Sequence, residues 1–170
     1  MAHDRSTRRA LTGSKRPKVR TVPKPNSVEI RELVPDDYEA VIALWRESEG
    51  VTIRDVDQRA PLTAYLIQHR GLSFVAVDAG AIVGSTLCGT DGRRGYLQHV
   101  AVAKSHRRLG IASALVDRSV RALAERGIDK CHLMVLADNV AAQAFWKAIG
   151  WKERPEIRLM SRTASGVLNA

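Results

Sequence analysis

The hydrophobic and polar residues of the chain alternate in blocks that predict short strands and amphipathic helices. Residues 28–33 (Val-Glu-Ile-Arg-Glu-Leu) alternate with a period of two, which is typical of a strand at the edge of a sheet. Residues 35–37 (Pro-Asp-Asp) favour the start of a helix, and apolar residues at helical spacing follow them up to Gly50. A second helix is predicted over residues 62–69, so one strand and two helices open the domain.

Three apolar segments then predict an antiparallel meander. Residues 72–77 and 81–88 are short apolar runs separated by Asp-Ala-Gly, a turn sequence that favours a hairpin. A second turn around Gly92 leads into a third apolar run, residues 96–103. We therefore expect three consecutive strands, each antiparallel to the one before it.

The clearest helix is predicted over residues 111–126, where apolar residues at helical spacing form one stripe and charged residues occupy the opposite side. Gly127 favours a helix end, and residues 130–136 are predicted to form the next strand. Strand 96–103, this helix and strand 130–136 form a β-α-β unit, so the two strands should be parallel and the crossover right-handed.

The remaining chain predicts one more helix and one more strand. Asp138 or Asn139 is expected to cap a helix that ends at Gly150, and residues 156–161 are predicted as the last strand. A length of 170 residues, with 45% hydrophobic and 26% charged residues, suits one soluble globular domain. We place this domain at residues 28–170.

The junction between strand 96–103 and helix 111–126 is a short basic loop that contains Lys104, Arg107 and Arg108. The start of a helix has unpaired backbone N–H groups and a partial positive charge, so it attracts anions. Gly110 has no side chain where a ligand would approach the backbone, and the arginines add full positive charge. The loop also lies at the carboxyl end of a strand, where ligands of open sheets collect. This combination predicts a binding site for a phosphate or pyrophosphate.

Two short motifs lie on either side of the predicted strand 130–136. Residues 107–112 (Arg-x-x-Gly-x-Ala) follow Val-Ala-Val, and residues 139–146 (Asn-x-x-Ala-x-x-Phe-Trp) precede Gly150-Trp151. The first resembles the acyl-CoA pyrophosphate loop of the GNAT superfamily of N-acetyltransferases. The second resembles the family's Asn-x-x-Ala-x-x-Phe-Tyr…Gly-Phe segment. The resemblance implies a three-layer α/β (α+β) domain, in which helices flank a mixed, mostly antiparallel sheet with one parallel strand pair.

The resemblance also implies that acetyl-CoA is the cosubstrate and that an acceptor amine attacks its thioester directly. Backbone groups near Val100 and Val102 would hold the acetyl group and the pantetheine arm, and the Val100 amide would polarise the acetyl carbonyl. Amides from Arg108 to Ala112 would bind the pyrophosphate, and Asn139 would contact the pantetheine arm or the adjacent backbone. No metal is expected. The expected cosubstrate-binding residues are Val100, Ala101, Val102, Arg107, Arg108, Leu109, Gly110, Ile111, Ala112, Asn139, Phe145 and Trp146.

His99 is predicted to be the general base. With the Val100 amide, which would polarise the acetyl carbonyl, it makes up the two predicted catalytic groups. Imidazole side chains exchange protons near neutral pH, and His99 lies on the strand beside the expected acetyl group. The alternative is a core imidazole bonded to a backbone carbonyl. Other candidates for the base are Glu47, Glu49 and Asp91.

Two positions depart from the family pattern. Met134 stands five residues before Asn139, where members resembling ribosomal-protein N-terminal acetyltransferases carry Glu; this disfavours that mechanism and substrate class. Trp146 replaces the Tyr that commonly protonates the leaving CoA sulfur. An indole N–H donates a hydrogen bond but does not give up its proton, so a water or another residue must serve, or turnover is poor.

Three functions follow from these residues. The leading prediction is N-acetyltransfer to a small-molecule amine, and the alternatives are a protein or peptide acetyltransferase and a CoA-binding module with weak catalysis. Acceptor contacts are expected from the predicted first helix and the loop after it, with Trp45, Glu47 and Glu49 as candidates. Trp45 is equally suited to the core, and the two glutamates to a solvated helix face.

The net charge of +9 is concentrated in residues 1–27, which carry eight Lys or Arg and one Asp. Low hydrophobicity and three prolines predict a disordered arm. A solvated extension, a weak contact with nucleic acid and an organellar presequence all fit this composition.

Cys88 and Cys131 lie in predicted strands without metal-ligand spacing, which favours reduced thiols in the cytoplasm. No apolar run is long enough for a membrane span, and assembly as a homodimer is compatible with the sequence.

Overall fold

The computed structural model describes residues 28–164 of the chain. The predicted basic arm, residues 1–27, and residues 165–170 lie outside the described residues. Short 3₁₀ turns occupy Pro35–Asp37, Asp55–Asp57 and Lys104–His106. The strands and helices, in chain order, are β1 (Glu29–Glu32), α1 (Tyr38–Arg46), α2 (Arg59–Gln68), β2 (Phe74–Asp78), β3 (Ala81–Thr90), β4 (Gly95–Val102), α3 (Ile111–Ala124), β5 (Cys131–Leu133) and α4 (Val140–Ala148).

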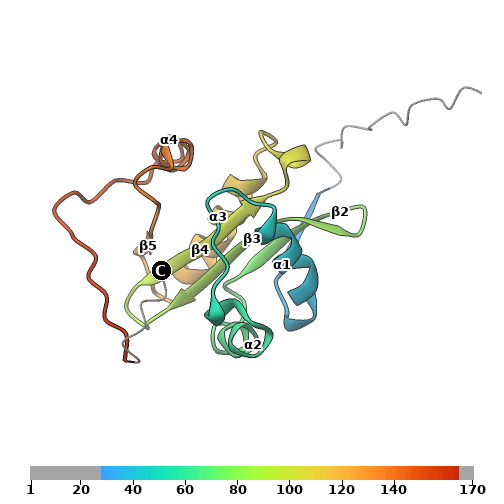
Figure 1. Cartoon of the computed structure of the whole chain (residues 1–170), viewed down its shortest axis with the longest axis horizontal. Coiled ribbons are helices and arrows are strands. Elements are labelled where there is room, and N and C mark those ends of the chain that lie inside the picture. The colour runs from blue at the N-terminus through green and yellow to red at the C-terminus, as the bar shows by residue number, and fades with distance from the viewer. Residues whose placement is uncertain (1–27, 165–170) are drawn as a thin grey trace, which may run out of the picture.

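The five described strands form one sheet in the order β1-β2-β3-β4-β5 (Figure 1). The pairs β1–β2, β2–β3 and β3–β4 are antiparallel, whereas β4 and β5 are parallel. The predicted meander and the predicted parallel pair around α3 are therefore confirmed. Because α3 connects two parallel neighbours, it must pack back across the sheet that it leaves.

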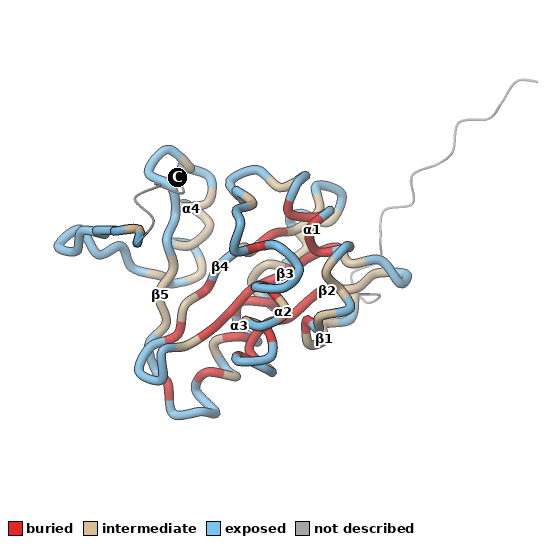
Figure 2. Tube along the Cα trace, turned by 60° about the horizontal axis from the view of Figure 1, so that its bottom comes forward, coloured by how far each residue is buried: buried red, intermediate tan, exposed pale blue. Residues whose placement is uncertain are grey.

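Helices cover both faces of the sheet, which gives three layers (Figure 1). Side chains of a strand point alternately to opposite faces. On β2, Val75 belongs to the same core cluster as Leu44 and Trp45 of α1, while Phe74 and Ala76 belong to a second cluster with residues from the start of α3. The most buried segments lie in the central strands and on the inner sides of the helices (Figure 2).

Gly84 of β3 allows α3 to approach the sheet closely. A Cβ atom at this position would lie 3.1 Å from both Ile111 Cγ2 and Leu115 Cδ1. Both side chains come from the first two turns of α3 and are buried. The apolar stripe predicted for this helix therefore fixes the position of its N-terminal end, which is the end that carries the predicted phosphate site.

The C-terminal part of the domain differs from the sequence prediction. β5 contains only residues 131–133 rather than 130–136, and beyond it the side chain of Met134 is 67% exposed. The strand predicted over residues 156–161 is wrong, because residues 150–164 contain no strand or helix. An added strand must pair with a sheet edge, and β5 offers only three residues for pairing. Leu159 and Met160 remain exposed as a result.

Arg31 and Asp37 form a bidentate ion pair between β1 and the 3₁₀ turn before α1. The two terminal guanidinium nitrogens, Nη1 and Nη2, each donate to the carboxylate at 2.7 Å, and Asp37 Oδ2 also accepts the Val34 amide at 3.0 Å. Burial alone would raise the pKa of Asp37, but the hydrogen bonds from Arg31 and Val34 and the charge of Arg31 outweigh it and lower this pKa. Ionised Asp37 therefore stabilises the folded state.

Asp37→Asn is expected to lower the free energy of unfolding by about 1–2 kcal/mol at neutral pH, because it removes a partly exposed, charge-assisted pair. Since the folded-state pKa of Asp37 is lowered, its contribution is complete above the unfolded pKa, about 4. It is lost as the pH falls through the folded-state value. Urea unfolding of both proteins between pH 3 and 7 checks this. A difference that stayed constant down to pH 3 would contradict the assignment.

Candidate active site

A β-bulge interrupts β4 at His99 and Val100. Ser85 of β3 faces Ala101 and Leu87 faces Gln98, so two residues of β4 lie opposite the one residue of β3 between them. His99 has a φ of +45°, an uncommon backbone conformation for a residue with a side chain. A bulge re-aims side chains and leaves a residue outside the ladder. The backbone of β4 therefore turns at the two residues predicted to catalyse the reaction.

From Gln98 onward, β4 and β5 no longer pair. The parallel ladder joins Gly95–Leu97 of β4 to Cys131–Leu133 of β5 and then ends. Within the described chain, the second half of β4, residues 98–102, has no strand partner on its β5 side. Backbone N–H and C=O groups on such an edge can form strand-like hydrogen bonds with an extended ligand.

The loop after β4 presents a run of unpaired amides. Arg108 and Gly110 have φ values of +66° and +78°, and α3 begins at Ile111. Among the described residues, the backbone N–H groups of residues 107–113 have no hydrogen-bond acceptor. A Cβ atom at Gly110 would meet no atom within 4 Å, so the space beside this glycine is open. The helix start therefore has the donors, the dipole and the room for a bound anion.

Two cations of this loop, Lys104 and Arg107, form ion pairs with Glu49, which follows α1. Glu49 Oε1 lies 2.9 Å from Lys104 Nζ, and Glu49 Oε2 lies 3.6 Å from Arg107 Nη1. Arg107 Nε also donates to the Val102 carbonyl at 3.3 Å. The hydrogen bond and charge of Lys104, with the charge of Arg107, lower the pKa of Glu49. Glu49 is therefore a carboxylate beside the predicted phosphate site rather than a candidate base.

Glu49→Gln is expected to tighten CoA binding by about threefold at low ionic strength, because an exposed carboxylate no longer competes for Lys104 and Arg107. Isothermal titration with CoA measures the dissociation constant. The gain should disappear in about 1 M salt, where exposed charges are screened. Weaker binding by the variant would show instead that Glu49 supports the loop.

Of the residues predicted on α4, Trp146 packs against a core cluster that includes Leu97 of β4. Asn139 caps this helix, since its Oδ1 accepts the Ala142 amide at 3.0 Å. Its Oδ1 is therefore already used in the helix cap, and its amide nitrogen lies against Gly50. Trp146 is half-buried, and its ring packs edge-on against Phe145 and Trp151 at centroid distances of 5.0 and 5.2 Å. Its indole N–H has no acceptor among the described residues.

His99 contacts Asp57, a residue that sequence reasoning missed. Asp57 Oδ1 lies 2.8 Å from His99 Nε2, and the Asp57 residue is only 3% exposed. The His99 ring also packs on Trp45, with centroids 4.4 Å apart. The expected alternative, an imidazole bonded to a backbone carbonyl, is not the arrangement found. No motif or periodic pattern in the sequence around Asp57 indicates this contact.

The other candidates fall outside this group. Trp45 is completely buried and donates to Ser85 Oγ at 2.8 Å, so the core interpretation is confirmed and the acceptor contact is wrong. Asp91 accepts amides in the turn before β4, at the opposite end of that strand. His106 contacts Asp78 at 3.1 Å, at the end of β2. Glu47 is exposed.

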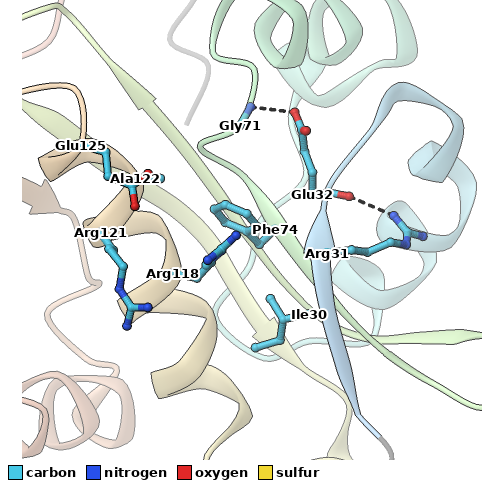
Figure 3. A pocket seen from close by; sticks show the side chains of 9 residues that line it. All are labelled: Ile30, Arg31, Glu32, Gly71, Phe74, Arg118, Arg121, Ala122 and Glu125. Carbon is cyan, nitrogen blue, oxygen red and sulfur yellow. Dashed lines mark hydrogen bonds between the residues drawn. The ribbon is translucent and has the colours of Figure 1, made fainter.

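Two surface cavities lie apart from the β4–α3 junction. One, of about 210 Å³, lies between β1 and the C-terminal half of α3, where Arg118 lies over the Phe74 ring (Figure 3). The other, of about 290 Å³, lies between β1, the turn after it and α2. Neither includes a residue predicted for the site. Within residues 28–164, no cluster of three potential metal ligands occurs, and no helix is long and apolar enough to cross a membrane.

Comparison with known proteins matches this geometry. The family model of the acetyltransferase (GNAT) family matches residues 30–151. An acetyltransferase of Pectobacterium atrosepticum is 36% identical over 125 residues, which cover 74% of this chain and 88% of the relative. An acetyltransferase of Sodalis glossinidius is 33% identical over 135 residues, which cover 79% and 94%.

Solved structures show the same fold. PaiA N-acetyltransferase from Thermoplasma acidophilum in complex with coenzyme A has a TM-score of 0.67 and 20% identity, and the match covers 74% of this chain and 90% of that one. AAC(6')-Iy in complex with a bisubstrate analogue has a TM-score of 0.65 and 19% identity, with coverages of 81% and 99%. Escherichia coli ribosomal-protein-S18-alanine N-acetyltransferase has a TM-score of 0.63 and 21% identity, with coverages of 75% and 79%. The chain belongs to the GNAT family and is an acyl-CoA-dependent acetyltransferase.

Proposed function

We propose that the protein transfers the acetyl group of acetyl-CoA to a primary amine of a small molecule. The observation that carries this proposal is the run of amides at residues 107–113 that lack acceptors within the described chain, next to the unpaired edge of β4. A pyrophosphate needs several converging donors, and a pantetheine arm needs an extended edge. Both lie at one junction.

The donor would bind along β4 from the bulge to the start of α3. The Val100 amide polarises the acetyl carbonyl, and residues 101 and 102 supply the strand-like contacts to the pantetheine arm. Amides of residues 108–112 hold the pyrophosphate, with Arg107 and Arg108 adding charge. On the other wall, Asn139, Phe145 and Trp146 line the path of the arm. Positioning the two reactants supplies much of the rate.

The leaving sulfur would depart as a thiolate that takes its proton from water. Trp146 stands where the family commonly has a Tyr, and its unpaired indole N–H can donate a hydrogen bond to the sulfur without losing its proton. This arrangement supports slower turnover than a tyrosine would allow. The competing function, a CoA-binding module with weak catalysis, rests on the same substitution.

Two acceptor classes compete, a small-molecule amine and a peptide. AAC(6')-Iy is an aminoglycoside N-acetyltransferase, and its structural similarity is compatible with a small-molecule amine. The ribosomal-protein-S18-alanine enzyme is also similar, so a peptide acceptor is the alternative. Met134 is exposed and apolar, which argues against the carboxylate-based mechanism expected of N-terminal acetyltransferases. We place the enzyme in the cytoplasm.

A thiol-release screen tests the proposal. The full-length protein is incubated with acetyl-CoA and spermidine, lysine, kanamycin or a peptide with a free N-terminus. Small-molecule acceptance predicts CoA release with one of the first three and none with the peptide; the reverse result would favour the alternative. CoA binding without release in any sample would favour the binding module.

The role of the basic arm is tested separately, by measuring RNA binding at several salt concentrations with and without residues 1–27. A contact of the arm with nucleic acid predicts binding that weakens steeply with salt and is lost in the shortened variant.

A further inference from the structure

Asp57 is the only buried carboxylate among the described residues, and both of its oxygens are used. Oδ2 accepts the Arg54 amide at 2.9 Å, and Oδ1 contacts His99 Nε2 at 2.8 Å. Burying a carboxylate is costly unless donors satisfy it. The Arg54 amide supplies only one donor, so His99 is required for the second oxygen. The two side chains therefore form one unit.

The direction of this hydrogen bond fixes the protonation pattern of the ring. An ionised carboxylate only accepts, so Nε2 must carry a hydrogen. In the neutral imidazole, the lone pair then lies on Nδ1. Trp45 packs on the ring and is itself held by Ser85, so the plane of the imidazole is restrained from a second side. The His99 side chain keeps 18% exposure.

Asp57 also links the two walls of the site. It belongs to the segment between α1 and α2, which is the predicted acceptor wall, whereas His99 lies at the bulge of β4. Among the described residues, Asp57 is the only charged group that forms a hydrogen bond or ion pair with the His99 ring. Its position therefore controls which edge of the imidazole faces a substrate.

We propose that Asp57 is a positioning residue that keeps His99 protonated at Nε2 and leaves Nδ1 free to accept the proton of the acceptor ammonium. This inference rests on the proposed function. The ammonium gives one proton to Nδ1, directly or through a water. The amine nitrogen then attacks the thioester carbon, and the C–N bond forms as the C–S bond breaks. The second nitrogen proton passes to water, and the CoA thiolate takes up a proton from water. Asp57 stabilises the imidazolium that results.

Asp37 supplies a matched control for Asp57. Both carboxylates accept the amide of the residue three positions earlier and close a 3₁₀ turn of the same kind, but Asp37 pairs with Arg31 far from the bulge. A purely structural role for Asp57 predicts similar behaviour of Asp57→Asn and Asp37→Asn. A positioning role predicts a change at His99 in the first variant only.

The experiment combines ¹⁵N NMR of the histidine rings with steady-state kinetics. In the wild-type protein, the neutral His99 ring should show hydrogen at Nε2, and Asp57→Asn should lose this preference while Asp37→Asn keeps it. With acetyl-CoA and the best amine of the screen, Asp57→Asn should lower kcat by at least about tenfold, shift the pH–rate profile and leave KM for acetyl-CoA unchanged.

Two results would overturn the inference. One is a wild-type His99 with hydrogen at Nδ1, and the other is an Asp57→Asn variant with unchanged kcat and pH–rate profile. If no amine supports turnover, the proposed function fails, but the NMR result still decides whether Asp57 holds His99 in this state. Failure of the function and failure of the positioning role are therefore distinguishable.

Discussion

Gly110→Asp is expected to raise the dissociation constant for CoA by at least about 100-fold, equivalent to about 3 kcal/mol. Gly110 lies in the middle of the amides that lack acceptors and has open space where a side chain would project. An aspartate there would occupy that space and place a carboxylate where the pyrophosphate is expected. Isothermal titration with CoA measures the loss.

Gly127→Asp is the matched control for this variant. Gly127 follows the other end of α3, has a φ of +76° against +78° for Gly110, and also has open space at its Cβ position. Both substitutions therefore impose similar backbone strain. Gly127→Asp should bind CoA like the wild type, although its thermal stability should be slightly below that of Gly110→Asp because a carboxylate is disfavoured at the C-terminal end of a helix. Unchanged CoA affinity in Gly110→Asp would refute the pyrophosphate assignment.

The parts of the site that follow from local sequence could be predicted. The apolar stripe of α3, the loop before it and Gly110 are contiguous, so their geometry depends on a few neighbouring residues. The parallel pairing of β4 and β5 follows from the helix between them. For the same reason, the expected phosphate site could be placed at the end of β4 from neighbouring residues alone, without information on contacts between distant parts of the chain.

The features that were missed depend on residues far apart in the chain. Asp57 and His99 are 42 positions apart, and the loop that brings them together has no periodic pattern. The bulge in β4 leaves no mark in a run of apolar residues, and its positive φ falls on His99 rather than on a glycine. The strand predicted over residues 156–161 alternates correctly but has no adequate edge to pair with. Local sequence patterns indicate where a strand or helix can form, but a strand forms only where a sheet edge is available for it to pair with.

The structure also changes the interpretation of the acceptor wall. Trp45 was a candidate for substrate contact, yet it is buried and supports His99 from below the surface. Glu49 was a candidate base, yet it neutralises cations of the loop after β4. The segment between α1 and α2 thus contacts the loop after β4 through Glu49 and the bulge through Asp57. If the proposed donor site is correct, this one segment borders both substrates of the reaction.

His99→Ala is expected to lower kcat by about 10²–10⁴-fold at neutral pH, because it removes the group that accepts the ammonium proton. The remaining activity should depend less steeply on pH between 6 and 8, since deprotonation would then rely on water. Steady-state rates with saturating acetyl-CoA and the best amine of the screen measure both effects. His132→Ala is the control, because His132 lies on β5 with its ring near Tyr96.

The positive φ of His99 requires a second variant. Alanine is strained at a φ of +45°, so part of the loss in His99→Ala could come from a relaxed bulge rather than from a missing base. Asparagine tolerates this backbone conformation but cannot accept the proton. His99→Asn should therefore keep the CoA affinity while losing the same rate and the same pH dependence, and both variants should lose some thermal stability because Asp57 Oδ1 is left without its partner. If either variant kept the wild-type pH–rate profile, His99 would not be the base. Its hydrogen bond with Asp57 would then have only a structural role, joining the segment after α1 to β4.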